Sequence, residues 1–288
     1  MITGLLLLFE KPTRNLRYIC IFLLVTLLGA WNPTSIAGTV SAASDPVDMA
    51  MPRAVPLRFA ASAKHTATVI FLHGLGDTGF GWASAVEGWI RRDKLNEVKF
   101  VLPHAPRMPI TAAEGMQLPG WFDIAALTGK VEDIRNNQDE RGLMETRDYI
   151  SSLVQAEIDA GIPANRIVLG GFSQGGAMAL LSGLTSKVKL GGVIALSAWL
   201  PLDSKFAALA QESNVNQDTP VFMAHGSVDT VVPTPFGKMS YEALKKLNYP
   251  VTMKLYNGMG HSACQEELDD VETFLLTRLP QGEGKSEL

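Results

Sequence analysis

"RIVLGGFSQGGAMAL", residues 166–180, sets one serine among four glycines directly after an apolar run typical of a strand. The residues from Gly171 to Gly175 match the pattern G-x-S-x-G, in which the serine lies on a sharp turn from a strand into a helix. Glycine is needed two positions before and after it because side chains there would clash with neighbouring backbone. A flexible turn with an ordinary loop serine is the alternative. The helix-forming stretch that follows, "AMALLSGL", favours a strained turn that holds Ser173 in the open as a nucleophile.

Strand-like and helix-like segments alternate on both sides of this turn. Short runs rich in Val, Ile and Leu occupy residues 66–74, 98–106, 166–173, 189–199, 220–227 and 251–258. Continuous apolar runs of this length are typical of strands buried on both faces of a parallel sheet. Helical spacing places one apolar set on a single face between residues 139 and 163, and a second set on the last helix: Leu143, Ile150, Leu153, Val154, Ile158; Leu268, Val271, Leu275. The pattern predicts an α/β fold, with helices on both faces of a mostly parallel central sheet.

A serine hydroxyl needs a histidine that takes its proton and an acid that orients the histidine. In this arrangement the chain order is serine, acid, histidine, and only His225 and His261 follow Ser173. His261 lies between the last predicted strand and the last helix, beyond the carboxyl edge of a parallel sheet, where catalytic groups gather. Asp229 follows the preceding strand and comes before His261. We therefore predict the pair Asp229 and His261, and interpret His225 as a turn residue hydrogen-bonded to the backbone.

The oxyanion of a tetrahedral intermediate needs two backbone donors. One is expected from the N–H of Gln174, the residue after the nucleophile. The stretch "FLHGLGDTG", residues 71–79, carries three glycines after an early strand, and we assign the second donor to the N–H of Leu75. His73 in this stretch is interpreted as structural. The chain has no pair of histidines at metal-ligand spacing and no G-x-G-x-x-G after a strand, so we predict no metal and no cofactor.

The segment from residue 103 to about residue 138 has four prolines and no sustained period. A loop of this length inside a compact domain is usually functional, and its apolar residues need something to cover. We therefore expect a lid or a wall of a binding site.

Composition argues against one class of partner and two kinds of cysteine site. The net charge is −4, and the absence of a basic block argues against a nucleic-acid partner. The chain has two cysteines, Cys20 and Cys264, which suit neither a disulfide framework nor a zinc site.

The N-terminus carries an apolar run, residues 18–31, that follows Arg14 and Arg17 and resembles the apolar core of a signal peptide. It is short for a membrane span of about 20 residues. Residues 1–50 are either a targeting signal or anchor, or an extension ahead of a true start at Met49 or Met51. The chain ends "KSEL", which is near an ER-retention signal. We expect a hydrolase domain over residues 51–280 and a flexible tail over residues 281–288.

The stretches "VIFLHGLGDTGFGW", "PHAP", "GWFDI", "LSAWLP", "HGSVDTVVP" and "GMGHSACQEE", with the serine motif, resemble the acyl-protein thioesterase/lysophospholipase family over about residues 55–280. The resemblance implies an α/β-hydrolase fold and a thioesterase that removes long-chain acyl groups, chiefly palmitoyl, from protein cysteines. It also implies esterase activity on lysophospholipids. Carried over, Ser173 is the nucleophile, Asp229 the acid and His261 the base, with Leu75 and Gln174 at the oxyanion hole.

The same resemblance implies an apolar channel for the acyl chain near the long segment, with four candidates: Met116, Leu118, Trp121 and Phe122. The expected partners are S-acylated proteins and lysophospholipids, reached by transient contact with a membrane surface, in the cytoplasm and also the nucleus. A secretory, ER or membrane-anchored location is the alternative if residues 1–50 are retained. Family members with an acylated N-terminal cysteine differ from this chain, which has no such cysteine after Met51. Two other functions stay open, an oxygen-ester lysophospholipase or carboxylesterase and a non-catalytic binding module.

Overall fold

The computed structural model describes residues 53–281. The chain divides into two units, Met1–Ala50 and Met51–Leu288, and everything below concerns the second. The apolar N-terminal extension and all but the first residue of the predicted tail therefore lie outside the described residues. Among the described residues, no helix has the length and apolar character needed to cross a membrane.

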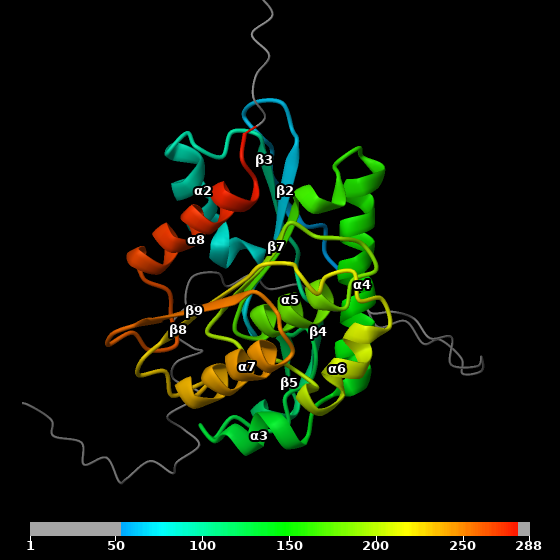
Figure 1. The fold of residues 1–288 in the computed structure, drawn as a ribbon. Coiled ribbons are helices and arrows are strands. Elements are labelled where there is room, and N and C mark those ends of the chain that lie inside the picture. Colours follow the sequence, from blue (N-terminus) through cyan, green and yellow to red (C-terminus); the bar gives the residue numbers. More distant parts are fainter. Residues whose placement is uncertain (1–52, 282–288) are drawn as a thin grey trace, which may run out of the picture. The chain divides into compact units, whose positions relative to one another are not determined.

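A seven-stranded sheet forms the centre of the fold, in the order β1-β3-β2-β6-β7-β8-β9 (Figure 1). Its strands are β1 (Leu57–Phe59), β2 (Ala67–Leu72), β3 (Val98–Leu102), β6 (Ile167–Phe172), β7 (Gly192–Leu196), β8 (Val221–Gly226) and β9 (Val251–Tyr256). All neighbours run parallel except β1, which pairs antiparallel with β3. The six predicted strands and the mostly parallel sheet are confirmed. The short edge strand β1 was not predicted.

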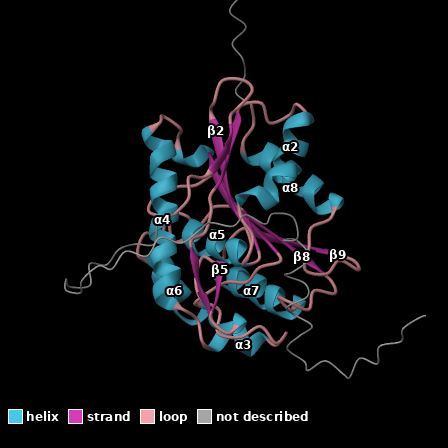
Figure 2. Cartoon of the chain, turned by 180° about the vertical axis from the view of Figure 1, so that it is seen from behind, coloured by secondary structure: helices cyan, strands magenta, loops and turns pink. Residues whose placement is uncertain are grey.

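Helices cover both faces of this sheet (Figures 1 and 2). On one face lie α2 (Ala83–Arg91) and α8 (Gln265–Arg278), and on the other α4 (Glu140–Asp159), α5 (Gln174–Leu184), α6 (Asp203–Gln211) and α7 (Thr234–Lys246). The strands alternate accordingly. In β2, Val69 and Phe71 pack into the α2–α8 core, whereas Ile70 and Leu72 pack into the core beneath α4 to α7. This burial on both faces explains the continuous apolar runs.

The helix α4 confirms the predicted apolar face of residues 139–163. Leu143, Ile150 and Val154 are buried against the core, so truncation of Leu143 or Ile150 to alanine would cost about 2–5 kcal/mol. The helix begins where the Asp139 carboxylate accepts a hydrogen bond from the N–H of Gly142 at 2.9 Å.

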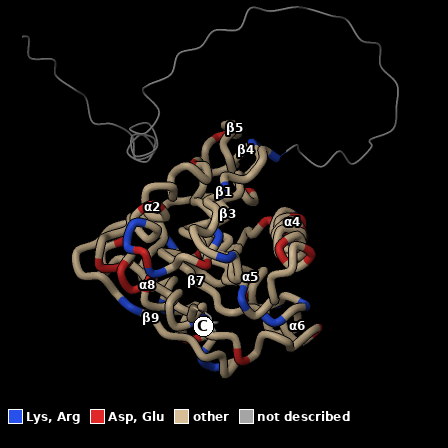
Figure 3. Tube along the Cα trace, turned by 90° about the horizontal axis from the view of Figure 1, so that it is seen from above, with Lys and Arg blue, Asp and Glu red and all other residues tan. Residues whose placement is uncertain are grey.

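The long segment after β3 is more ordered than the sequence predicted. It contains the antiparallel hairpin of β4 (Arg107–Ile110) and β5 (Met116–Pro119), followed by α3 (Val131–Asn136). The turn of the hairpin carries Glu114 and Gly115 at positive φ. Each strand has only four residues and β4 includes Pro109, so no alternation was visible in the sequence. Along the chain trace, Lys and Arg positions are interspersed with Asp and Glu positions (Figure 3).

Candidate active site

Ser173 lies on the turn between β6 and α5 with φ 54° and ψ −121°, a conformation that non-glycine residues rarely adopt. Its N–H donates to the Leu196 carbonyl at 2.8 Å, which ties the turn to β7. A side chain at Gly171 would overlap the backbone of Gly175, and one at Gly175 would overlap the carbonyl of Leu72. The predicted strained turn, with glycine required on both sides of the serine, is confirmed.

The structure brings the three predicted residues of the triad together. His261 Nε2 lies 2.9 Å from Ser173 Oγ, and His261 Nδ1 lies 2.7 Å from Asp229 Oδ2. The other carboxylate oxygen, Asp229 Oδ1, accepts from the backbone N–H groups of Val231 at 2.9 Å and Val232 at 3.0 Å. Because the carboxylate only accepts, the Nδ1 of His261 carries a proton and its Nε2 accepts from the serine hydroxyl.

Loop packing at the carboxyl edge of the sheet creates this arrangement. Asp229 follows β8 and His261 follows β9, two neighbouring parallel strands. The two loops touch, since the N–H of Val228 donates to the Met259 carbonyl at 3.1 Å. A side chain at Gly226 would overlap that same carbonyl, so glycine allows the approach. Strand order therefore brings Asp229, 32 positions before His261, and Ser173, 88 positions before it, into one hydrogen-bonded row with His261.

Two opposing effects set the charge of Asp229. Burial alone would raise the pKa of its carboxyl, but hydrogen bonds and charge interactions with His225 and His261 lower the pKa well below its ordinary range. Asp229 is therefore ionised throughout the physiological pH range. A fixed negative charge at this position would favour a protonated imidazole at His261.

His225 differs in part from its prediction. It is bonded to the backbone as expected, with Nε2 2.9 Å from the Val232 carbonyl oxygen, but it lies in β8 rather than in a turn. Its Nε2 is also 3.4 Å from Asp229 Oδ2, a contact that the sequence analysis missed. The available signal was a histidine at the end of an apolar strand, four residues before an acid.

Within the part of the chain that the structure describes, the two predicted oxyanion donors are both unengaged. Among the acceptors of residues 53–281, none receives a hydrogen bond from the backbone N–H of Leu75 or Gln174. The loop that carries Leu75 lies against Ser173, because a Cβ added to Gly74 would be 3.5 Å from the Ser173 Cβ. Gln174 is the first residue of α5, whose initial N–H groups have no partner within the helix. Neither N–H is therefore committed to an acceptor in the described part of the chain.

His73 has the structural role that was expected. Its ring is buried, with Nδ1 2.7 Å from the Gly74 carbonyl and Nε2 accepting from the Ala105 N–H at 3.0 Å. Burial lowers the pKa of His73 to about 4, so the ring is neutral at physiological pH. No group of three or more metal-ligating side chains occurs within the described range.

The four acyl-binding candidates do not form one wall. Met116 is 54% exposed at the hairpin and Leu118 is half-buried. Trp121 and Phe122 are 2% and 3% exposed, and both belong to the core beneath α4 to α7. The cavity beside Phe122 is about 10 Å³, the space of a single water rather than of an acyl chain.

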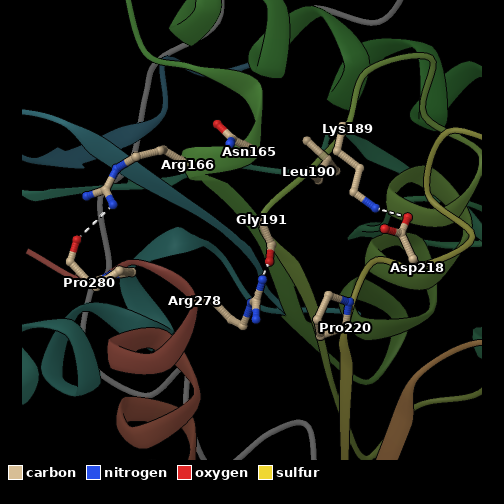
Figure 4. A pocket seen from close by; sticks show the side chains of 9 residues that line it. All are labelled: Asn165, Arg166, Lys189, Leu190, Gly191, Asp218, Pro220, Arg278 and Pro280. Carbon is tan, nitrogen blue, oxygen red and sulfur yellow. Dashed lines mark hydrogen bonds and ion pairs between the residues drawn. The ribbon is translucent and has the colours of Figure 1, made fainter.

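A larger hollow of about 390 Å³ lies at the opposite edge of the sheet, where β6, β7 and β8 begin (Figure 4). Three cationic side chains line it, and each has a partner. Arg166 donates to the Pro280 carbonyl at 2.8 Å and Arg278 to the Gly191 carbonyl at 2.9 Å, while Lys189 pairs with Asp218. None of its nine lining residues is a serine, cysteine or histidine, so it lacks the chemistry of the triad.

Comparison with known proteins agrees with this geometry. Residues 59–279 match the family described as phospholipase/carboxylesterase. Acyl-protein thioesterase 1 of Neurospora crassa is 58% identical over 235 residues, which cover 82% of this chain and 96% of that protein. Acyl-protein thioesterase 1 of Gibberella zeae is 56% identical over 232 residues, with 81% and 99% covered.

Solved structures give the same result. Zea mays acyl-protein thioesterase 2 aligns with a TM-score of 0.68 and 29% identity, covering 78% of this chain and 98% of that one. Arabidopsis thaliana SOBER1 aligns with a TM-score of 0.69 and 30% identity, covering 74% and 99%. The α/β-hydrolase fold and the resemblance seen in the sequence motifs are confirmed. The chain therefore belongs to the phospholipase/carboxylesterase family of α/β-hydrolases, in the group that includes the acyl-protein thioesterases.

Proposed function

We propose that this protein is a serine hydrolase that cleaves thioesters of long-chain fatty acids, chiefly palmitate, from protein cysteines. The observation that carries the proposal is the hydrogen-bonded row of Ser173, His261 and Asp229 at the carboxyl edge of the sheet. The 58% identity to an acyl-protein thioesterase 1 supports the choice of substrate. The intact row argues against a non-catalytic binding module, in which these positions would be free to degrade.

The reaction runs through a covalent acyl-enzyme. Ser173 Oγ attacks the thioester carbonyl while its proton passes to His261 Nε2. The negative charge that develops on the carbonyl oxygen is stabilised by the N–H groups of Leu75 and Gln174. The carbon–sulfur bond then breaks, and His261 returns the proton to the departing cysteine sulfur. Asp229 holds the imidazole in the required tautomer throughout.

The second half of the cycle releases the fatty acid. Water attacks the carbonyl carbon of the acyl-enzyme and gives its proton to His261 Nε2. The bond between Ser173 Oγ and the acyl carbon breaks, and the proton returns to the serine. Each step uses only residues of this chain and water, so we propose neither a metal nor a cofactor.

The partners follow from this chemistry. S-acylated proteins are the proposed substrates, and lysophospholipids are the alternative. An acyl chain would approach past the hairpin, where Met116 and Leu118 keep apolar surface. Trp121 and Phe122, the other two candidates, would back this region from within the core rather than line it directly. A substrate whose acyl chain is anchored in a bilayer requires transient contact with a membrane surface. We propose no role for nucleic acid.

The test is loss of turnover in Ser173→Ala with a palmitoylated peptide as substrate. Ser152→Ala is a matched control, because Ser152 is exposed on α4 and its hydroxyl bonds the Tyr149 carbonyl of the same helix. The control should match the wild type, while Ser173→Ala should fall below a hundredth of its rate and lose labelling by a fluorophosphonate probe. Retained turnover above that level in Ser173→Ala would overturn the proposal.

An oxygen-ester substrate is a second candidate, since the matching family is described as phospholipase/carboxylesterase. The triad serves both reactions because they share the tetrahedral intermediate. Comparison of kcat/KM on a palmitoylated peptide and on a lysophospholipid, both presented in the same mixed micelles, decides between them. A higher value on the lysophospholipid would replace the thioesterase proposal.

We further propose that residues 51–280 are the catalytic domain and that it acts in the cytoplasm and nucleus. The alternative places it in the secretory pathway or on a membrane through residues 1–50. The N-terminal residue of the protein isolated from its own cells distinguishes these. Met51 at the N-terminus supports the cytoplasmic enzyme, whereas a start near Ala43 indicates secretory cleavage.

A further inference from the structure

Residues 119–122 connect the β4–β5 hairpin to the rest of the domain and contact the loop that carries Leu75. The Pro119 carbonyl accepts a hydrogen bond from the N–H of Gly76 at 2.8 Å. The indole Nε1 of Trp121 donates to the His73 carbonyl at 2.8 Å. These two bonds hold the backbone just before and just after Leu75.

The same segment holds the side chain of Gln174, which is fully buried. The Gln174 Oε1 accepts from the backbone N–H of Trp121 at 2.9 Å, and its Nε2 donates to the Phe122 carbonyl at 2.6 Å. The amide therefore accepts a hydrogen bond from Trp121 and donates one to Phe122. This pairing determines which way the amide oxygen and nitrogen point. Because the side chain and the backbone N–H of Gln174 share one Cα, the bonds also restrain where that N–H lies.

The segment is itself anchored by α4 and by the residue before β4. The Thr146 hydroxyl on α4 donates to the Trp121 carbonyl, and the N–H of Gly120 donates to the Pro106 carbonyl at 3.0 Å. The Trp121 ring stacks on Tyr149 of α4 with centroids 6.5 Å apart. A side chain at Gly120 would come within 3.2 Å of the Leu75 Cδ1, so the segment also packs closely on Leu75.

We propose that residues 119–122 set the separation of the two oxyanion donors, with the Gln174 side chain and the Trp121 indole as positioning residues. The proposal rests on the proposed function, since it assigns Leu75 and Gln174 to the transition state. It deepens that function by linking the Leu75 loop and the turn at Gln174 through residues 119–122. Donors aimed at a developing oxyanion stabilise it only within a narrow range of distances. Loosening this link therefore reduces the stabilisation of the transition state more than it reduces the binding of substrate.

The first test is Gln174→Met, which keeps the length and burial of the side chain and removes both hydrogen bonds. We expect kcat on a p-nitrophenyl ester to fall about 10- to 100-fold, which is at most about the effect of removing one oxyanion donor. The KM should stay within about twofold of the wild-type value. The inhibition constant of an alkyl trifluoromethyl ketone, which forms an oxyanion on Ser173, should rise by the same factor. Inhibition by the free fatty acid product should not change.

The matched control is Asn216→Leu. Asn216 is also a fully buried amide that bonds several backbone groups, including the N–H of Leu190 at 2.9 Å, but it lies at the opposite edge of the sheet. This variant should lower the melting temperature and leave kcat within about twofold. A general loss of stability therefore cannot imitate the expected result.

The second variant is Trp121→Phe, which keeps a ring in the core and removes the bond to His73; it serves also if Gln174→Met does not fold. A similar loss of kcat at constant KM is expected. The kcat of the double variant should fall by less than the product of the two single-variant factors, because both substitutions act through one segment.

Wild-type kcat and inhibitor binding in either folded variant, or a rise in KM alone, would overturn the inference. If Ser173→Ala is inactive while Gln174→Met equals the wild type, the inference fails and the proposed function stands.

Discussion

His225 and Asp229 lie side by side in the protein interior, with the imidazole Nε2 3.4 Å from the carboxylate Oδ2 and both side chains fully buried. The same Nε2 is bonded to the Val232 carbonyl, so His225 is held by the loop that carries Asp229. His225 therefore supports the acid without reaching Ser173. This geometry distinguishes the two histidines that follow Ser173 in the sequence.

His225→Leu should destabilise the fold and spare most of the activity. The change leaves the buried Val232 carbonyl without its donor, which costs about 1–3 kcal/mol in the free energy of unfolding by urea. We expect kcat/KM to stay above a tenth of the wild-type value at 20 °C, whereas His261→Ala should abolish it. Equal losses in the two variants would instead make His225 part of the proton transfer.

Asp229→Asn should keep the loop and lose the reaction. The amide oxygen can still accept from the N–H groups of Val231 and Val232, but the amide nitrogen would face His261 Nδ1 and donate to it. The proton of the imidazole then moves to Nε2, which can no longer accept from Ser173. We expect kcat to fall about 10³- to 10⁴-fold with an unchanged melting temperature. A loss of less than tenfold would show that Asp229 does not orient the histidine.

Gly171→Ala should fail through the backbone. A Cβ at this position overlaps the Gly175 backbone, which has no room to shift within α5, so we expect a loss of at least about 2 kcal/mol or no folded protein. Gly88→Ala is the control, since Gly88 lies inside α2 and a Cβ added there would meet no atom within 4 Å. That substitution should stabilise the protein by up to about 1 kcal/mol. Thermal unfolding of both variants gives the comparison, and equal melting temperatures would contradict it.

Glu267→Gln should change the pH dependence of stability. The Glu267 carboxyl is fully buried in the first turn of α8, and neither oxygen has a hydrogen-bond partner among residues 53–281. Burial, with a smaller contribution from Asp270, raises the pKa of this carboxyl to about 8. Between its unfolded value near 4.5 and about 8, the folded protein holds one more proton than the unfolded chain. Stability therefore falls by about 1.4 kcal/mol per pH unit as the pH rises through this interval.

The glutamine variant keeps the neutral form at every pH and removes this loss. Urea unfolding should give similar stability for the variant and the wild type at pH 5, and a variant more stable by about 3 kcal/mol at pH 8. Glu87→Gln, on the exposed side of α2, is the control and should follow the wild type. A constant difference between pH 5 and pH 8 would show that Glu267 does not hold its proton.

Much of the fold was predictable from local sequence patterns. The sharp turn at Ser173 was predictable because its requirement for glycine acts within five residues. The buried strands were predictable because each one is apolar on both faces, and the acid and histidine followed from their places after successive strands. Shorter elements were not predictable. The three residues of β1 and the four-residue strands β4 and β5 are too short to carry a period.

The sequence alone determined the fold class, because it depends on short-range spacing and on strand direction. The same spacing predicted Ser173 as the nucleophile and the order of the triad. Only the tertiary structure decided that Trp121 is a core residue bonded to the Leu75 loop, that His225 contacts Asp229, and that the Gln174 amide joins two loops. The physical reason is distance along the chain. The Gln174 side chain bonds residues more than fifty positions away, and no local pattern encodes which backbone groups a buried amide will find.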